Sequence, residues 1–290
     1  MTQRSDIDEL TTPMTSLKTP SSLAHIAYIL QIADNALVIG HRLSEWCGHG
    51  PALEQDIAIT NTALDHIGQS RGAYQHAANL YNALSPDEQR RLFTSPAIQG
   101  VTDALDEDDI AYLRDVWDFK NSLLTEQPNG DWAYTIARSF FYDSFQFLYY
   151  AELQRSPDEE LAAIAEKSFK EVSYHRRWSS EWMIRLGDGT TESRERLQRA
   201  VDARWMFTGE LFTPSAADQF AQDSGLGPNL ASLKEPWLAY VRGIMDQATV
   251  TLPTDPWMQE GGKEGRHSEH LGYILAEMQF MQRAYPNMEW

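Results

Sequence analysis

The sequence contains a single cysteine, Cys47, among its 290 residues. A disulfide framework within the chain is therefore excluded, and one thiol is consistent with a protein of the reducing cytoplasm. The sequence also lacks the glycine-rich motifs that bind phosphates or dinucleotides. We therefore expect neither a nicotinamide nor a flavin to bind to this chain.

Basic residues are scarce, because 24 lysines and arginines stand against 42 aspartates and glutamates. The formal net charge is −18 and the isoelectric point is near 4.8. Such a charge repels nucleic acids and anionic membrane surfaces, so we expect neither of them as a partner. A protein with a basic docking surface would be a better match.

Long apolar runs are few. Residues 1–22 have no apolar segment of the kind found in signal peptides and are rich in serine, threonine and proline, which predicts a disordered tail. The most apolar run starts at Leu23 and is interrupted by His25, Gln31 and Asp34. We interpret it as too short to cross a membrane and expect a cytoplasmic protein.

The apolar residues that are present recur at helical spacing. We predict long helices over residues 23–46, 52–80 and 131–155, and a fourth that SPDEEL caps and that ends at LGDG. Ser156 is the predicted N-cap of the fourth helix, with Glu159 completing a capping box. No run of alternating residues demands a sheet, so the predicted fold is all-α. It is a ferritin-like four-helix bundle with additional C-terminal helices, forming a single domain over residues 23–290.

The second predicted helix has an apolar stripe that we expect to face the core, formed by Leu53, Ile57, Leu64, Ile67 and Tyr74. Acids and histidines lie on or beside the inner stripes of all four helices. Because unpaired charges are costly inside a bundle, they require a partner or a metal. The candidate residues for this polar core are Asp34, His41, Asp65, Asp143, Glu171 and His175.

This set is close to the inventory of a di-iron centre, which uses four carboxylates and two histidines. The spacing argues against such a centre, because each histidine should follow a glutamate by three residues, whereas Tyr174 stands three places after Glu171. We favour a metal-free network in which the acids pair with His41, His175, Arg42 or Arg138. A di-iron site with unusual ligands is the alternative.

Other reactive groups lack the partners that catalysis needs. Cys47 lies near His41 and His49 in the sequence, but no orienting acid or oxyanion device accompanies it. His267 and His270 are too few for a zinc site, and we expect them to serve packing around a glycine-rich loop. We assign no catalytic, cofactor-binding or metal-binding residue.

Four long strings carry a resemblance to a known family. They are DNALVIGHRLSEWCGHGPALEQDIAITNTALDHIGQSR from Asp34, EQPNGDWAYTIARSFFYDSF from Glu126, KEVSYHRRWSSEWMIRLGDGTTES from Lys170 and GGKEGRHSEHLGYILAEMQFMQRAYP from Gly261. Together they resemble the structural, PaaC-type subunits of bacterial phenylacetyl-CoA epoxidase. The resemblance covers nearly the whole chain from about residue 23, outside the tail and parts of residues 81–120.

The resemblance implies a multicomponent oxygenase that epoxidises the aromatic ring of phenylacetyl-CoA during aerobic phenylacetate degradation. In that family a catalytic subunit, PaaA, holds the di-iron site. A reductase supplies electrons from NADPH through a flavin and an iron–sulfur cluster. The PaaC-type subunit is a ferritin-like relative without the metal, and it supports PaaA.

We therefore expect a non-catalytic subunit with a degenerate di-iron site and no cofactor of its own. Its expected partners are PaaA and the other epoxidase components, in a hetero-oligomer, with a homodimer as the alternative for the chain alone. Two other functions stay open: a di-iron oxygenase subunit with unusual ligands, and a free-standing ferritin-like binding protein.

Overall fold

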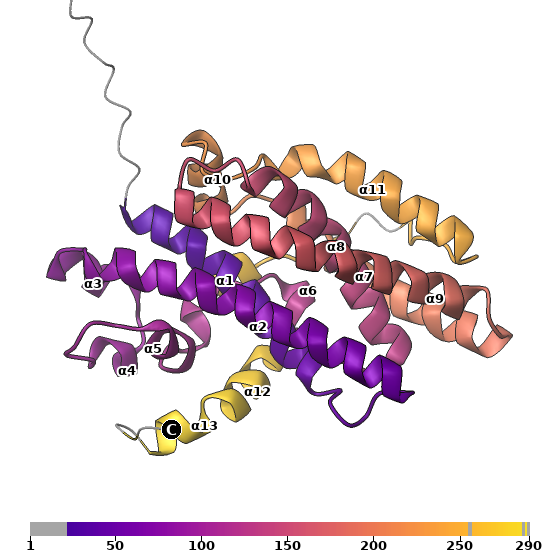
Figure 1. The fold of residues 1–290 in the computed structure, drawn as a ribbon, viewed down its shortest axis with the longest axis horizontal. Helices are drawn as coiled ribbons and strands as arrows, with labels where there is room; N and C mark the ends of the chain where they lie inside the picture. Colours follow the sequence, from indigo (N-terminus) through magenta and orange to yellow (C-terminus); the bar gives the residue numbers. More distant parts are fainter. Residues whose placement is uncertain (1–21, 255–256, 286–287, 289–290) are drawn as a thin grey trace, which may run out of the picture.

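A computed structural model describes residues 22–254, 257–285 and 288. The predicted tail at residues 1–22 lies outside this part except for Ser22, and the predicted domain boundary stays a prediction. The described residues form helices and no strand, which confirms the all-α prediction (Figure 1). The elements are α1 (Ser22–Ser44), α2 (Leu53–Asn82), α3 (Pro86–Leu92), α4 (Pro96–Gln99), α5 (Glu107–Tyr112), η1 (Val116–Asp118), α6 (Leu123–Glu126), α7 (Trp132–Leu153), α8 (Glu159–Gly187), α9 (Thr191–Trp205), η2 (Gly209–Phe212), α10 (Ala216–Asp223), α11 (Leu230–Gln247), η3 (Gly262–Glu264), α12 (Glu269–Met278) and α13 (Phe280–Ala284).

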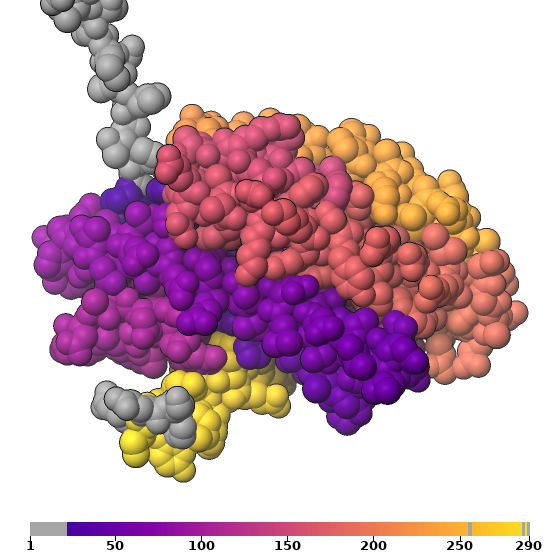
Figure 2. All heavy atoms as spheres, viewed as in Figure 1, coloured from indigo at the N-terminus to yellow at the C-terminus, as the bar shows by residue number. Residues whose placement is uncertain are grey.

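The four long helices form the bundle. α1 packs along α2, α7 packs along α8, and contacts between α2 and α8 join the two pairs. The polar crossover at residues 83–131 carries the short helices α3 to α6. α9 and α11 cover α7 and α8, α10 rests on α1, and α12 and α13 lie at one edge of the molecule (Figures 1 and 2). This arrangement is the predicted ferritin-like bundle with additional C-terminal helices.

α1 is mostly buried, with 15 of its 23 residues in the interior. By length and composition it could cross a membrane, contrary to the expectation that its apolar run is too short, but 72% of its most apolar window is buried inside the bundle. Its burial is that of a core helix. The apolar spacing that predicts this helix is that of Leu23, Ile26, Leu30, Leu37 and Leu43, and all of these are buried except Leu23, which is partly buried.

The buried apolar residues form two clusters, and α1 contributes to both. Tyr28, Ile32 and Ile39 belong to a large cluster that includes much of α7 and α11 and part of α8. Ile29 and Leu37 belong to a smaller one that includes residues of α2, the crossover and α12. α1 thus lies between the two halves of the core.

α2 forms close to its predicted bounds, but the face predicted to be buried was wrong over much of its length. Leu53, Ile57 and Leu64 are 72%, 53% and 63% exposed instead of buried. The buried face consists of small and polar residues, which let α1 approach closely: a Cβ on Gly40 of α1 would lie 2.9 Å from Cδ1 of Ile67. The buried residues of α2 are Ile59, Thr62, Ala63, His66, Gln69, Ser70, Ala73, Tyr74, His76, Ala77 and Ala78.

The N-cap of α8 also differs from the prediction. Asp158, not Ser156, is the cap, and its side chain accepts a hydrogen bond from the backbone nitrogen of Leu161 at 3.0 Å. A capping side chain must reach the free N–H groups of the first helical turn, and Ser156 stands two residues too early. Its hydroxyl instead accepts from the backbone nitrogen of Asp158 at 3.3 Å.

Candidate functional site

Three buried polar side chains converge in the middle of the bundle. His66 comes from α2, Asp143 from α7 and His175 from α8, and all three are 1% exposed or less. One ligand atom of each lies within 4.8 Å of the ligand atoms of the other two. The two imidazole rings are tilted against each other with their centroids 4.9 Å apart.

The outward nitrogen of each imidazole is held by a neighbour. Nδ1 of His66 lies 3.2 Å from Oε1 of Gln69, while the amide nitrogen of Gln69 donates to Glu171 at 2.9 Å. Nε2 of His175 lies 2.9 Å from Oδ2 of Asp65. Because these oxygens can only accept, each outward nitrogen carries the proton.

The inward atoms have no hydrogen-bond partner among the described residues. They are Nε2 of His66, Nδ1 of His175 and both carboxylate oxygens of Asp143. With the outer nitrogens protonated, two imidazole lone pairs and a carboxylate face one another. This set requires either a positive charge or a proton between its members.

Burial shifts the titration of these groups. Desolvation raises the pKa of Asp143 to about 6, although His175, Ser179 and Arg138 act to lower it. Desolvation, helped by the nearby His175, holds the pKa of His66 well below its ordinary value. Desolvation also raises the pKa of Glu171, against the hydrogen bond from Gln69. The environment thus favours the neutral forms of Asp143, His66 and Glu171.

Of the predicted polar core, four members come together: Asp65, Asp143, Glu171 and His175. Among the predicted pairs, only that between Asp65 and His175 is present, with Asp65 38% exposed at the edge of the cluster. The side chain of His41 forms no hydrogen bond or ion pair among residues 22–254 and 257–285, and burial lowers its pKa.

Arg42 and Arg138, the predicted cationic partners, do not bind the acids of the predicted core, and the carboxylate that Arg42 does bind is that of Glu45, at 2.8 Å. Arg42 donates twice to the carbonyl oxygen of Glu126, at 3.0 Å each. Arg138 donates to the carbonyl of Gln127 and to Oδ1 of Asn129. Each planar guanidinium group donates more than one hydrogen bond to the segment that leads into α7 and fixes its path.

His66 was missed by the sequence analysis. The apolar stripe predicted for α2 put Asp65 beside the core, and the next residue, His66, was not considered. The signal that identifies His66 is a second helical stripe of small residues, in which His66 follows Ala63 by three positions and precedes Ser70 by four. A helical stripe of small residues indicates a close contact between helices, just as a stripe of large apolar residues indicates a buried face.

Comparison with known proteins identifies the family. The sequence profile described as "Phenylacetic acid catabolic protein" matches residues 1–290. The chain therefore belongs to this family. A curated relative is the subunit designated "C" of the 1,2-phenylacetyl-CoA epoxidase of Escherichia coli (strain K12). It is 41% identical over 264 residues, which cover 91% of this chain and 98% of the relative. The resemblance inferred from the sequence strings is confirmed.

The residues of this family member do not fit a di-iron centre. Such a centre needs carboxylates that can bridge two ions in addition to a histidine for each. In the described part of the chain, Asp143 is the one carboxylate grouped with both imidazoles, because Asp65 contacts the outward nitrogen of His175 and Glu171 accepts from Gln69. The set offers too few oxygens for two irons.

Asp34 belongs to a separate network in the second half of the core. It accepts from Tyr74 at 2.6 Å, from the backbone nitrogen of Lys120 at 2.8 Å and from both terminal nitrogens of Arg114. Asp34 and Arg114 are both fully buried. This pair ties α1 to the crossover, so Asp34 is a structural residue here.

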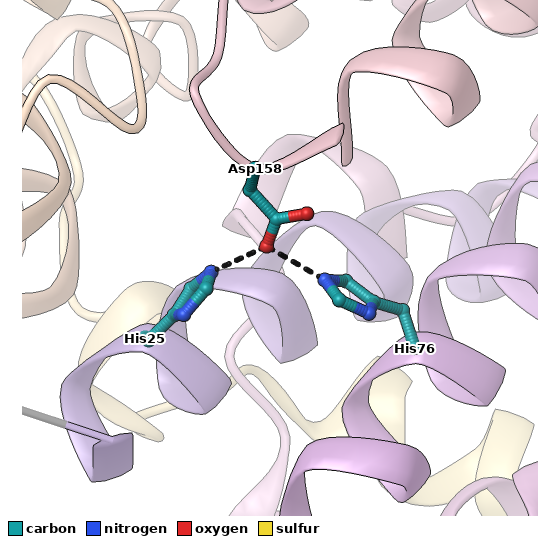
Figure 3. Close-up of side chains that lie close together, drawn as sticks. All are labelled: His25, His76 and Asp158. Carbon is teal, nitrogen blue, oxygen red and sulfur yellow. Dashed lines mark hydrogen bonds and ion pairs between the residues drawn. The ribbon is translucent and has the colours of Figure 1, made fainter. Parts of the chain in front are cut away.

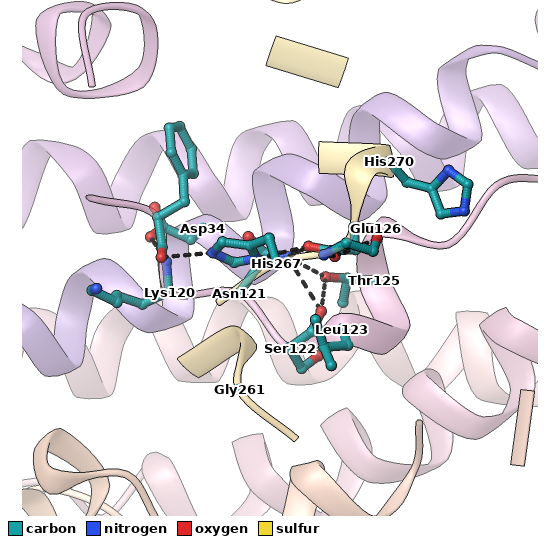
Figure 4. A network of polar contacts seen from close by, with 12 residues as sticks. Asp34, Lys120, Asn121, Ser122, Leu123, Thr125, Glu126, Gly261, His267 and His270 are labelled. Carbon is teal, nitrogen blue, oxygen red and sulfur yellow. Dashed lines mark hydrogen bonds and ion pairs between the residues drawn. The ribbon is translucent and has the colours of Figure 1, made fainter. Parts of the chain in front are cut away.

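A third network joins the crossover to the C-terminal region (Figure 4). Nδ1 of His267 lies 2.8 Å from Glu126, and its Nε2 lies 2.9 Å from the carbonyl of Phe119. Both nitrogens of His267 are therefore occupied, and His270 points away from this group in Figure 4. The geometry agrees with the predicted packing role of these histidines.

Proposed function

We propose that this chain is the non-catalytic structural subunit of a cytoplasmic ring 1,2-phenylacetyl-CoA epoxidase, in which it binds and stabilises the di-iron catalytic subunit PaaA. The observation that carries the proposal is an exposed apolar stripe on a chain whose central polar cluster does not fit a di-iron centre. The kinship with a subunit of such an epoxidase supports it.

The metal-free state of the cluster has a chemical basis. A carboxyl group with a pKa near 6 is partly protonated at neutral pH, and its proton can be shared with the facing lone pair of an imidazole. The shared proton offsets the repulsion between the carboxylate and the imidazole lone pairs, as a bound metal ion would do in a catalytic relative. The cluster then serves to hold α2, α7 and α8 together.

The docking surface that we propose is the α2 stripe, defined by Leu53, Ile57 and Leu64. These residues lie on one side of the helix and are all more than half exposed. One turn after Leu64, a Cβ on Gly68 would meet no atom within 4 Å, so the surface continues without obstruction. Exposed apolar patches of this kind mark protein contacts. PaaA is the proposed occupant, and the net charge of −18 on this chain favours a partner surface with a basic rim.

Metal analysis tests the absence of a catalytic site. We expect no stoichiometric iron in the chain purified alone, and iron in a stable complex after co-expression with PaaA, with size-exclusion chromatography separating the two. About two irons per lone chain would refute the proposal in favour of a di-iron subunit with unusual ligands. A well-behaved oligomer with no affinity for PaaA would support a free-standing binding protein instead.

Substitutions in the α2 stripe test the docking surface. Replacing Ile57 and Leu64 together with serine removes apolar area without adding charge, and we expect the affinity for PaaA to fall about 30-fold or more, as for central interface residues. Because both side chains are exposed, the thermal stability of the lone chain should change little.

The matched control replaces Tyr273 and Phe280, which are 66% and 59% exposed near the C-terminus, with serine. We expect this variant to bind PaaA as the unaltered chain does. If the control loses affinity and the α2 variant does not, the docking surface lies on α12 and α13, and the assignment to α2 is wrong.

A further inference from the structure

A second group of histidines and an acid lies at one end of the bundle, away from the central cluster. His25 is near the start of α1, His76 near the end of α2, and Asp158 caps α8 (Figure 3). Nε2 of His25 lies 2.9 Å from Oδ2 of Asp158, and Nε2 of His76 lies 2.7 Å from the same oxygen. The three ligand atoms are within 4.8 Å of one another.

The carboxylate of this group is held in a fixed orientation. Its Oδ1 accepts a hydrogen bond from the backbone nitrogen of Leu161, which leaves Oδ2 facing both imidazoles. A metal-binding carboxylate is commonly oriented in this way by a hydrogen bond to its other oxygen. The cap of α8 therefore also prepares a ligand.

The two imidazoles use this oxygen unequally. Nε2 of His76 makes a hydrogen bond to it, whereas Nε2 of His25 is sealed from solvent and has no well-directed hydrogen bond. Nε2 of His25 lies 2.9 Å from an oxygen that it shares with His76, and a buried imidazole nitrogen with one poorly aligned contact has a desolvation cost that a bound cation would lower. His25 is thus the side chain whose polar contacts a bound cation would improve most.

The site lies near the surface. The side chains of His25, His76 and Asp158 are 16%, 10% and 10% exposed, so the group lies just below the surface. Two imidazoles and one carboxylate supply three of the four ligands of a tetrahedral zinc site. The central cluster, by contrast, is fully buried.

We propose that His25, His76 and Asp158 form a site for one divalent transition-metal ion of the zinc class. Two nitrogens and one carboxylate oxygen suit Zn²⁺, and a water molecule completes the coordination. The ligands come from three helices whose positions in the sequence are far apart. A bound ion links the start of α1 and the last turns of α2 to the start of α8, and thus joins the two helix pairs. It has a structural role and takes no part in an oxygenase reaction.

Zinc titration of the full-length chain without a histidine tag tests the proposal. With a chromophoric competitor, we expect one Zn²⁺ per chain to bind at this site, and Co²⁺ to give the visible bands of a four-coordinate ion. The melting temperature should rise by about 5 °C when Zn²⁺ exceeds its dissociation constant a hundredfold.

Replacing His25 or His76 with glutamine should weaken zinc binding at least 30-fold and remove the rise in melting temperature. Asp158→Asn is a companion variant, because asparagine retains the capping function while losing the charged ligand. His175→Gln, in the central cluster, is the control and should leave this binding event intact.

The proposal is wrong if the unaltered chain binds no zinc at micromolar concentration. It is also wrong if the His25 and His76 variants bind zinc with unchanged stoichiometry and affinity. Should His76→Gln fail to fold, His25→Gln still decides the matter, since it removes one ligand while the hydrogen bond between His76 and Asp158 remains.

Discussion

Replacing Arg114 with methionine is expected to lower the free energy of unfolding by about 3–5 kcal/mol, the cost of leaving one charge of a buried pair without its partner. Arg114 and Asp34 are both fully buried. Methionine keeps an unbranched apolar side chain in place of the alkyl part of Arg114, whereas the guanidinium carbon, which lies 4.1 Å from the ring centre of Phe119, is removed. What is lost is the charge and its hydrogen bonds.

The loss extends beyond the ion pair. Arg114 also donates to the carbonyls of Ile110 at 2.6 Å and Asp118 at 3.2 Å, and to the hydroxyl of Tyr74 at 2.8 Å. These acceptors would have no replacement in the dry interior, and each unsatisfied group is itself costly. The substitution therefore removes the centre of the contact between α1 and the crossover.

A double-variant cycle in urea separates these contributions. If the stranded carboxylate accounts for most of the loss, Arg114→Met combined with Asp34→Asn should be more stable than Arg114→Met alone. The control is Arg155→Met at an exposed pair with Glu152, where little change is expected. Equal losses at the buried and the exposed pair would contradict the importance assigned to Arg114.

Replacing Asp143 with asparagine is expected to stabilise the chain at pH 8 by up to about 2–3 kcal/mol, on the basis of 1.36 kcal/mol per pK unit. The native pKa of about 6 is higher than that of an unfolded aspartate. Ionised Asp143 is therefore disfavoured in the folded state. Asparagine is nearly isosteric, carries no charge and can donate to the lone pair of His66 or His175.

The effect depends on pH in a defined direction. Because the native state holds the Asp143 proton more tightly than the unfolded state does, stability falls as pH rises from about 4 to 6 and is level above that. The advantage of Asp143→Asn should thus be large at pH 8 and small near pH 4. Urea unfolding at both values measures it.

This variant also distinguishes a metal-free cluster from a metal site. If Asp143 were a metal ligand, its replacement would destabilise the chain at pH 8, and the loss would disappear after chelation. A stabilised variant, unaffected by chelator, agrees with the structural role proposed here. Ser144→Ala on the same helix serves as a packing control without a charge change.

The sequence predicted the bundle well wherever large apolar residues face the core. The ends of α1 and α7 fall within two residues of their predicted positions, because the stripes and the turn signals agree there. The buried face of α2 was predicted wrongly because Leu53, Ile57 and Leu64, which are large and apolar, face outward. Periodicity shows that a helix is amphipathic but cannot tell a core from an interface between proteins.

The site was predictable in part for a similar reason. Asp143, Glu171 and His175 lie on strongly apolar helix faces, so their charges were conspicuous. The partner of Asp34 was not predictable, because Arg114 lies 80 residues away in a crossover whose path depends on tertiary contacts. The grouping of His25, His76 and Asp158 was not predicted, because each of them lies near a helix end, where polar residues are expected.

The position of α1 between the two apolar clusters has a consequence for how the molecule comes apart. A helix whose residues belong to both halves cannot leave one of them while staying in the other, so neither half can melt by itself without exposing the apolar surface of α1. The chain should accordingly unfold in one cooperative step despite its length. A subunit of this kind offers its partner a rigid support that is either wholly present or wholly lost.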